Sequence, residues 1–185
     1  MNAVSTIPSP AGLLIVDPQK AFSRVAPPGF WDSIAKLAAG FTHLGLSQFV
    51  NHEDSIVWRY KHWKKLQRGS PGSELLWDPG TLNPNAQTIH FEKDGFTAAT
   101  PGFVEWVKKA GLKEVYLCGG EIDLCIMRTA IGLMEAGIRP LVLVNYCYTP
   151  AGPEVYRYAV IQAKRYLGKP QVFEGMLTRP GEGKG

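Results

Sequence analysis

The sequence predicts a three-layer, Rossmann-like α/β fold in which a mostly parallel sheet of about six strands lies between helices. Two observations predict it: short apolar runs without polar alternation, and amphipathic segments with helical spacing between those runs. Unbroken apolar runs are typical of strands buried on both faces, and alternating strands and helices are typical of parallel sheets covered on both sides.

Three continuous apolar runs give the strongest strand predictions, because each ends at a glycine or a polar residue. They cover residues 13–16 before Asp17, residues 114–118 before Gly119, and residues 141–144 before Asn145. Weaker patterns predict strands over 46–51, 88–92 and 171–173.

Four segments have the apolar spacing of helices that pack one face against a sheet. Thr100 has the side chain of an N-cap, and Pro101 suits a first helical turn. Gly111 and Gly137 are placed to end helices. The predicted helices cover residues 30–41, 101–110, 125–136 and 153–167.

Length and composition are those of one globular domain. With 185 residues, 45% hydrophobic and 19% charged, the chain can bury a substantial core and is unlike disordered chains. We expect a single domain over residues 1–178 and a flexible tail over 179–185. No apolar run is long enough to span a membrane, and the first ten residues lack the pattern of a signal peptide. Three cysteines without C-x-x-C spacing favour a reducing, cytoplasmic location.

Candidate site residues follow the predicted strands, because sites in parallel sheets form at the carboxyl ends of the strands. Asp17 follows the first strand, Asn51 ends the second, and Lys93 follows the third. Cys125 follows the glycine turn after the next strand.

Cys125 is the candidate nucleophile. A thiol at a helix start is biased toward the thiolate, and nearby backbone N–H groups can hold an oxyanion. A carboxylate such as Asp17 can accept the thiol proton, and the Lys93 ammonium can stabilise the thiolate. From spacing alone, however, the commoner role of a free cysteine is a small buried residue, and that of a single lysine is a solvated surface group.

Three motifs resemble those of the isochorismatase-like cysteine hydrolases. Residues 13–22 resemble the opening motif, an apolar strand followed by D-x-Q-x-x-F. Residues 91–99 resemble the second, a strand followed by the catalytic lysine and a turn of small residues. Residues 119–130 resemble the third, G-x-E/A-T-D-x-C-V-x-x-T-A, and residues 70–74 resemble the family's proline-glycine loop. The motifs occur in the family's order and coincide with the strand ends chosen above.

The resemblance implies an enzyme that cleaves a C–N bond of a small amide, carbamoyl or ureido substrate through a thioester on Cys125, without a cofactor. Its relatives are nicotinamidases, ureidoacrylate amidohydrolases and N-carbamoylsarcosine amidohydrolases. Asp17, Lys93 and Cys125 would form the catalytic triad. Two alternatives stay open: an isochorismatase-type hydrolase of vinyl ethers, and a catalytically silent binding or scaffold protein that uses residues 58–68.

The resemblance also implies the surroundings of the triad. A cis peptide bond is expected between Gly120 and Glu121, with the backbone N–H groups of Glu121 and Cys125 as the oxyanion hole. The residues expected around the substrate are Gln19, Phe22, Asn51, Phe96 and Gly120.

The sequence departs from the family pattern at three positions. Gly120 replaces a residue that is usually β-branched or apolar, Ile122 replaces a common threonine, and Asn145 stands where an aspartate usually ends a strand. These departures weaken the expectation of a standard substrate and leave the triad complete.

A metal site is not expected. Nicotinamidases in this superfamily bind a metal with an aspartate and two histidines, the first two spaced D-x-H after the second strand. Here the best alignment puts Glu53 and Ser55 in those positions, and other alignments offer only His52 or His62. Divalent metals of this kind prefer more imidazole ligands.

Residues 58–68 combine basic and aromatic side chains, and without this stretch the chain is slightly acidic. The aromatic members are Trp58, Tyr60 and Trp63, and the basic members are Arg59, Lys61, Lys64, Lys65 and Arg68. Such a mixture can bind single-stranded nucleic acid, but no nucleic-acid motif accompanies it. We therefore favour a lid over the site or a contact in a homo-oligomer, with a small-molecule substrate and neither nucleic acid nor membrane as a partner.

Overall fold

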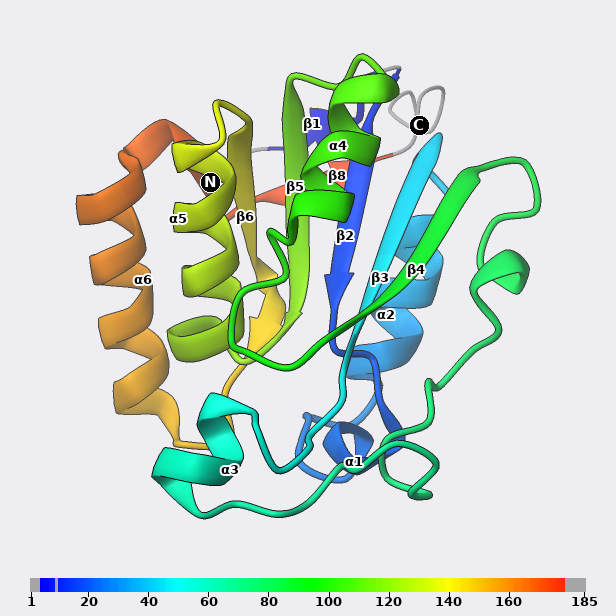
Figure 1. The fold of residues 1–185 in the computed structure, drawn as a ribbon. Coiled ribbons are helices and arrows are strands. Elements are labelled where there is room, and N and C mark those ends of the chain that lie inside the picture. Colours follow the sequence, from blue (N-terminus) through cyan, green and yellow to red (C-terminus); the bar gives the residue numbers. More distant parts are fainter. Residues whose placement is uncertain (1–3, 9, 179–185) are drawn as a thin grey trace.

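The computed structural model describes residues 4–8 and 10–178, and it confirms the predicted α/β fold with a sheet of six strands (Figure 1). All six strands are parallel, in the order β4-β3-β2-β5-β6-β7. They are β2 Gly12–Val16, β3 His43–Phe49, β4 Gln87–Lys93, β5 Glu114–Gly120, β6 Arg139–Tyr148 and β7 Val172–Phe173.

Unbroken apolar runs form the central strands because both faces of the sheet are covered. In β2, Leu14 and Val16 pack into one hydrophobic cluster, while Leu13 and Ile15 pack into the cluster on the opposite face. All four side chains are buried, which is the reason that no polar residue alternates with them.

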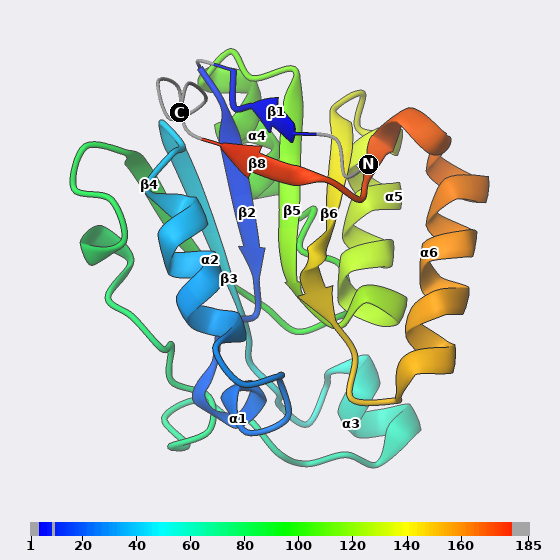
Figure 2. The ribbon, with the colours of Figure 1, turned by 180° about the vertical axis from the view of Figure 1, so that it is seen from behind.

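Helices form the two outer layers. One face of the sheet carries α4 Pro101–Lys109, α5 Met127–Glu135 and α6 Pro153–Leu167, and the other carries α2 Phe30–Ala38 (Figures 1 and 2). Two short helices, α1 Lys20–Ser23 and α3 Ile56–Lys61, lie beyond the carboxyl ends of β2 and β3 (Figure 1). The short 3₁₀ turns are Pro79–Thr81 and Lys169–Gln171, and a π-helical turn covers Ile122–Ile126.

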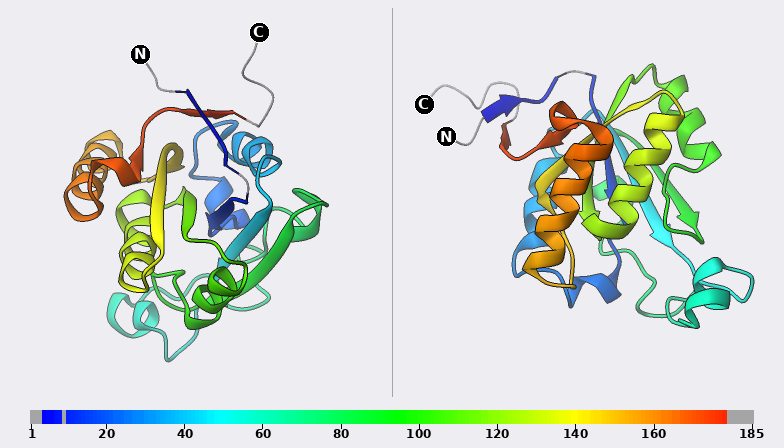
Figure 3. Two further views of the ribbon diagram at one scale, coloured as in Figure 1. Left: turned by 90° about the horizontal axis from the view of Figure 1, so that it is seen from above. Right: turned by 90° about the vertical axis from the view of Figure 1, so that its left-hand side faces the viewer.

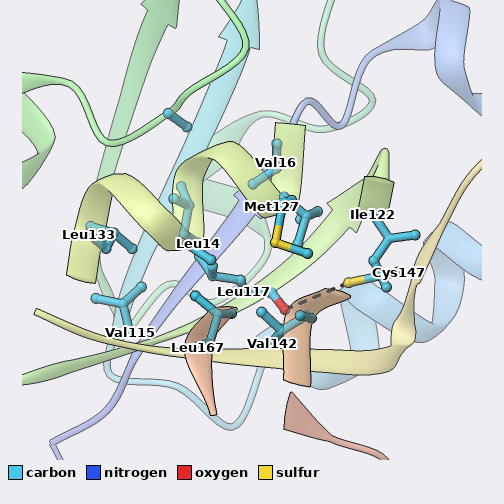
Figure 4. Close-up of a cluster of buried hydrophobic side chains, with 14 of the residues drawn as sticks. Leu14, Val16, Val115, Leu117, Ile122, Met127, Leu133, Val142, Cys147 and Leu167 are labelled. Atoms are coloured by element: carbon cyan, nitrogen blue, oxygen red, sulfur yellow. Dashed lines mark hydrogen bonds between the residues drawn. The ribbon is translucent and has the colours of Figure 1, made fainter. Parts of the chain in front are cut away.

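The larger hydrophobic cluster lies between the sheet and α4, α5 and α6. Leu117 of β5 is fully buried there, with Leu14, Val142 and Leu133 in the same cluster (Figure 4). Cys147 also belongs to this core, and its thiol lies 3.9 Å from the Leu117 carbonyl oxygen (Figure 4). Packing in the core therefore explains the presence of Cys147 without a catalytic role.

A second, two-stranded parallel sheet was not predicted. It pairs β1 Val4–Thr6 with β8 Met176–Thr178, so that the two ends of the described chain meet on the side of α2 (Figures 2 and 3). Both strands are too short to show a periodic pattern. The predicted tail over 179–185 lies outside the described residues.

The predicted elements differ from the observed ones mainly at their ends. The helix predicted over 30–41 ends at Ala38, and the strand predicted over 46–51 covers His43–Phe49. Thr100 is the N-cap of α4 as predicted, because its side chain accepts a hydrogen bond from the Phe103 N–H. Among the described residues, no helix has the length and apolar character needed to cross a membrane.

Replacing Leu117 by alanine should lower the free energy of unfolding by about 2–5 kcal/mol, because a fully buried side chain would leave a cavity in the core. Urea unfolding followed by circular dichroism measures this change. The matched control is Val25→Ala, because Val25 is 49% exposed and its truncation should change the same quantity by less than about 0.5 kcal/mol. Equal losses in both variants would contradict the assigned core.

Candidate functional site

The carboxyl ends of the strands bring Asp17, Lys93 and Cys125 together. The Lys93 ammonium lies 2.9 Å from the Asp17 carboxylate and 3.6 Å from the Cys125 sulfur. Asp17 directly follows β2, Lys93 is the last residue of β4, and Cys125 lies in the π-helical turn after β5. Three segments far apart in sequence thus meet through one ammonium group.

Asp17 is held by its backbone conformation and by β3. Its φ is 53°, in the left-handed region that residues other than glycine rarely adopt. The Ser47 hydroxyl donates to the Asp17 carboxylate at 2.8 Å, and the Asp17 N–H donates to the same hydroxyl at 3.1 Å. Such outliers often occur at functional sites because the surrounding contacts enforce them. Ser47 was missed from the sequence, since a buried serine within a strand carries no distinguishing pattern.

Lys93 is almost completely buried, with a side chain 1% exposed. Its ammonium also donates to the carbonyl oxygens of Gly95 at 3.0 Å and Phe96 at 3.5 Å, and it lies 5.3 Å from the centre of the Phe49 ring. Burial favours the neutral amine, but Asp17 and Cys125 outweigh this effect and raise the pKa of Lys93. The lysine is therefore a fixed cation at neutral pH.

The structure corrects the expectation that Cys125 opens an α-helix and is biased toward thiolate. Cys125 lies inside the π-helical turn, and α5 begins two residues later at Met127. Burial, followed by the charge of Asp17, raises the pKa of the Cys125 thiol to about 12, although Lys93 acts in the opposite direction. The resting group is therefore a neutral thiol beside a carboxylate that can take its proton.

The turn that precedes Cys125 has the predicted cis peptide bond between Gly120 and Glu121. The N–H groups of Leu124 and Ile126 donate to the Glu121 carbonyl oxygen at 3.1 and 3.0 Å. Gly119 has a φ of 108°, and a Cβ atom there would lie 2.3 Å from the Val16 carbonyl oxygen. This close approach of β5 to β2 requires glycine.

The ring of Tyr148 explains why position 120 is a glycine. A Cβ atom on Gly120 would lie 2.3 Å from Cε1 of Tyr148, so the tyrosine ring occupies the space where other residues carry a side chain. Tyr148 is buried and packs edge-on against Phe30, with ring centres 4.9 Å apart. The absence of a side chain at position 120 is therefore compensated by packing from β6.

A cavity of about 340 Å³ opens beside the cysteine. Of the predicted site residues, Asp17, Phe22, Phe96, Glu121 and Cys125 line it. The other lining residues are Phe49, Val57, Lys61, Trp63 and Leu124. Lys61 and Trp63 belong to the basic aromatic stretch, whereas Phe49, Val57 and Leu124 follow apolar patterns that a core would explain equally well.

Three predicted pocket residues lie outside the cavity lining, and each has a structural role. The fully buried Gln19 side chain donates to the carbonyl oxygens of Phe49 and Ser73 at 3.0 and 2.8 Å and accepts from the Phe49 N–H at 2.9 Å. Gly120 packs against Tyr148.

Asn51 is the third of these residues. Its amide nitrogen is hydrogen-bonded to the carbonyl oxygens of Trp63 and Lys65, and its amide oxygen accepts from the Ser55 hydroxyl. Ser55 also caps α3, because its side chain accepts from the Trp58 N–H at 3.2 Å. These hydrogen bonds hold residues 55–65 next to the cavity. The side chains of Lys61 and Trp63 form part of the cavity wall. The position agrees with a lid, and the homo-oligomer contact stays a prediction.

The described residues do not fit a metal site of the nicotinamidase kind. They contain no group of three or more His, Cys, Asp or Glu side chains that could hold a metal ion. Ser55 caps a helix, Asn51 is engaged with backbone carbonyl groups, and His52 pairs with Asp94 at 3.1 Å. The chemistry of this donor set gives no metal a sufficient number of ligands.

Comparison with known proteins identifies the family. The model of the isochorismatase domain family matches residues 11–171. No curated protein matches the sequence significantly.

Solved structures share the fold at low sequence identity. The nicotinamidase/pyrazinamidase of Bacillus subtilis is 20% identical, with a TM-score of 0.73 over 89% of this chain and 100% of that one. N-carbamoylsarcosine amidase of Thermoplasma acidophilum is 19% identical, with a TM-score of 0.67 over 95% of this chain and 99% of that one. A pyrazinamidase of Pyrococcus horikoshii in complex with zinc is 19% identical, with a TM-score of 0.65 over 92% and 99%.

Alkylation of Cys125 by iodoacetamide should increase steadily from about pH 7 to about pH 10 without a plateau, because the pKa of the buried thiol is about 12. Asp17→Asn should move this profile to lower pH, since it removes a negative charge that raises the thiol pKa. Lys93→Gln should move it to higher pH, since it removes the charge that lowers the pKa. Peptide mapping by mass spectrometry measures the rates, with circular dichroism as the folding control. A plateau below about pH 8 in the unchanged protein would show a resting thiolate instead.

The packing of Tyr148 against Gly120 should appear as coupling in a double-mutant cycle. Gly120→Ala should destabilise the protein by about 1–3 kcal/mol, because the new methyl group overlaps the tyrosine ring. The same change combined with Tyr148→Ala should cost less than the sum of the two single changes. Urea unfolding measures all three variants, with Gly102→Ala as the control because no atom lies within 4 Å of a Cβ there. Additive effects would rule out the pairing.

Proposed function

The chain belongs to the isochorismatase domain family, and we propose that it is a cysteine amidohydrolase that cleaves a C–N bond of a small amide, carbamoyl or ureido compound. The observation that carries the proposal is the triad geometry. One buried ammonium contacts both a carboxylate and the thiol, and the thiol borders a cavity. A nucleophile, a proton acceptor and a fixed cation are the groups that nucleophilic acyl transfer requires.

The first half of the proposed reaction forms a thioester. The Asp17 carboxylate accepts the proton of the Cys125 thiol while the sulfur attacks the substrate carbonyl carbon, and the carbonyl π electrons move to the oxygen. The N–H groups of Glu121 and Cys125 would donate to this oxyanion. As the oxyanion collapses, the C–N bond breaks, the nitrogen takes the proton from Asp17, and ammonia or an amine leaves.

The second half releases the acid. Water attacks the thioester carbonyl carbon and gives a proton to the Asp17 carboxylate. The C–S bond breaks, and the departing sulfur regains that proton, which restores the neutral thiol. Lys93 keeps its proton throughout, since Asp17 and Cys125 raise its pKa, and it stabilises whichever neighbour is negative at each step.

The site also supports a small substrate. A volume of about 340 Å³ is near the lower end of the range of ligand pockets, and its walls include the aromatic rings of Phe22, Phe49, Trp63 and Phe96. The amidases that share the fold act on small compounds according to their names, which agrees with this size.

The sequence-based expectations of a homo-oligomer and of a cytoplasmic location stay predictions. On α6, Tyr158, Ile161 and Tyr166 are exposed, and aromatic residues of this kind are enriched where protein surfaces associate.

Replacing Cys125 by alanine should abolish release of ammonia from an amide and ureido panel, with a loss of at least about 10³-fold in kcat, and should keep the fold. The control Cys147→Ala removes a thiol that packs in the core outside the cavity and should keep activity. In the unchanged enzyme, rapid acid quench and intact-mass spectrometry should detect the acyl group on Cys125. Retained turnover in Cys125→Ala would exclude a covalent role for this thiol, and retained hydrolysis of a vinyl ether alone would favour the isochorismatase-type reaction.

A further inference from the structure

Two ionisable side chains line the cavity without belonging to the triad. Lys61 projects from α3, and Glu121 follows β5, directly beside the groups expected to hold the oxyanion. Lys61 is the only lysine or arginine among the described residues that line this cavity. Lys93 of the triad does not line this cavity, and its ammonium is paired with Asp17.

The segment that carries Lys61 is fixed on both sides. Before it, Ser55 caps α3. After it, the carbonyl groups of Trp63 and Lys65 are bound by the Asn51 amide, and His62 turns the chain with a φ of 54°. The backbone that carries Lys61 is therefore held beside the cavity by hydrogen bonds on both sides.

The Lys61 ammonium is available to a ligand. It lies 5.7 Å from the centre of the Phe96 ring, which is a weak interaction at an exposed site. No carboxylate lies within 4 Å of it in the described part of the chain. An anionic group entering the cavity would thus meet a cation that is in contact with no carboxylate, with Glu121 as a more distant neighbour.

Glu121 adds a carboxyl group, which can accept a hydrogen bond, to the lining of the same cavity. Its side chain is half-buried in the cavity wall, and burial together with Asp123 and Asp17 raises the pKa of its carboxyl group, whereas Lys61 lowers it. The NH₂ of an amide or ureido group is a donor, so it can bond to Glu121 while its carbonyl carbon faces Cys125.

We propose that Lys61 selects substrates that carry a carboxylate, so that the enzyme acts on anionic amides or ureido acids with the carboxylate at Lys61 and the NH₂ at Glu121. This inference rests on the proposed function and adds the substrate's charge to it. The aromatic rings of Phe96 and Trp63 line the same cavity and would contact the carbon skeleton of such a substrate.

Charge selection is tested first without any turnover, by the ratio of Cys125 alkylation rates with iodoacetate and iodoacetamide. The two reagents share a leaving group and a similar size and differ in charge. Lys61→Gln should lower this ratio by about fivefold, because an exposed charge pair of this kind contributes up to about 1 kcal/mol. Lys61→Arg should keep the ratio. The matched control is Lys64→Gln, since Lys64 stacks on Trp58 and lies outside the cavity.

Turnover is tested with succinamate and butyramide, two primary amides of equal chain length of which only the first carries a carboxylate. The unchanged enzyme should favour succinamate in kcat/KM by at least about tenfold. Lys61→Gln should remove most of this preference, because it should raise the KM for succinamate much more than the KM for butyramide.

The outcomes separate the two proposals. One outcome is that Lys61→Gln lowers the iodoacetate-to-iodoacetamide rate ratio and Lys64→Gln does not, while no amide releases ammonia. This outcome would overturn the proposed function and leave charge selection by Lys61 in place. Turnover of both amides at equal rates, or equal effects of Lys61→Gln and Lys64→Gln on the alkylation ratio, would overturn the inference and leave the hydrolase intact.

Discussion

The ion pair between Lys93 and Asp17 is the constraint on which the rest of the site depends. Both side chains are at most 2% exposed, and buried charges are tolerated only when they are paired and further hydrogen-bonded. The Ser47 hydroxyl supplies one such bond to the carboxylate, and the Gly95 carbonyl supplies another to the ammonium. The carboxyl ends of β2, β3 and β4 must therefore keep one relative arrangement, and this arrangement positions Lys93 against Cys125.

The same pair decides how the thiol reacts. Burial contributes most to the raised pKa of Cys125, Asp17 raises it further, and Lys93 lowers it. The resting site therefore holds a neutral thiol beside a compensated ion pair. In the proposed reaction, moving the thiol proton to Asp17 neutralises the carboxylate, and Lys93 is then left facing the new thiolate. The cation is thus shared between the two groups and favours the attacking state without requiring a thiolate at rest.

Packing and hydrogen bonds replace features that the family pattern leads one to expect. At the turn before Cys125, the ring of Tyr148 fills the space that Gly120 leaves open. Beyond β3, the Asn51 amide binds the carbonyl groups of Trp63 and Lys65, and the described residues form no cluster of metal ligands. In both places uncharged side chains supply the packing or the hydrogen bonds, and Lys61 is the only lysine or arginine among the described residues that line the cavity.

The amino-acid pattern alone determined the layers of the fold, because strands buried on both faces leave an unbroken apolar signal. It also indicated Asp17, Lys93 and Cys125 as candidates, because they follow such strands or their turns, whereas their joint role as a triad was implied by the family resemblance. The tertiary structure decided what depends on contacts between distant segments. It showed that Gln19 and Asn51 lie outside the cavity lining and support it, because their side-chain amides bind backbone carbonyl groups of other segments. It also buried the Cys125 thiol, which raises the pKa of this group, and brought Lys61 to the cavity. Burial and proximity are properties of the folded chain and leave no periodic trace in sequence.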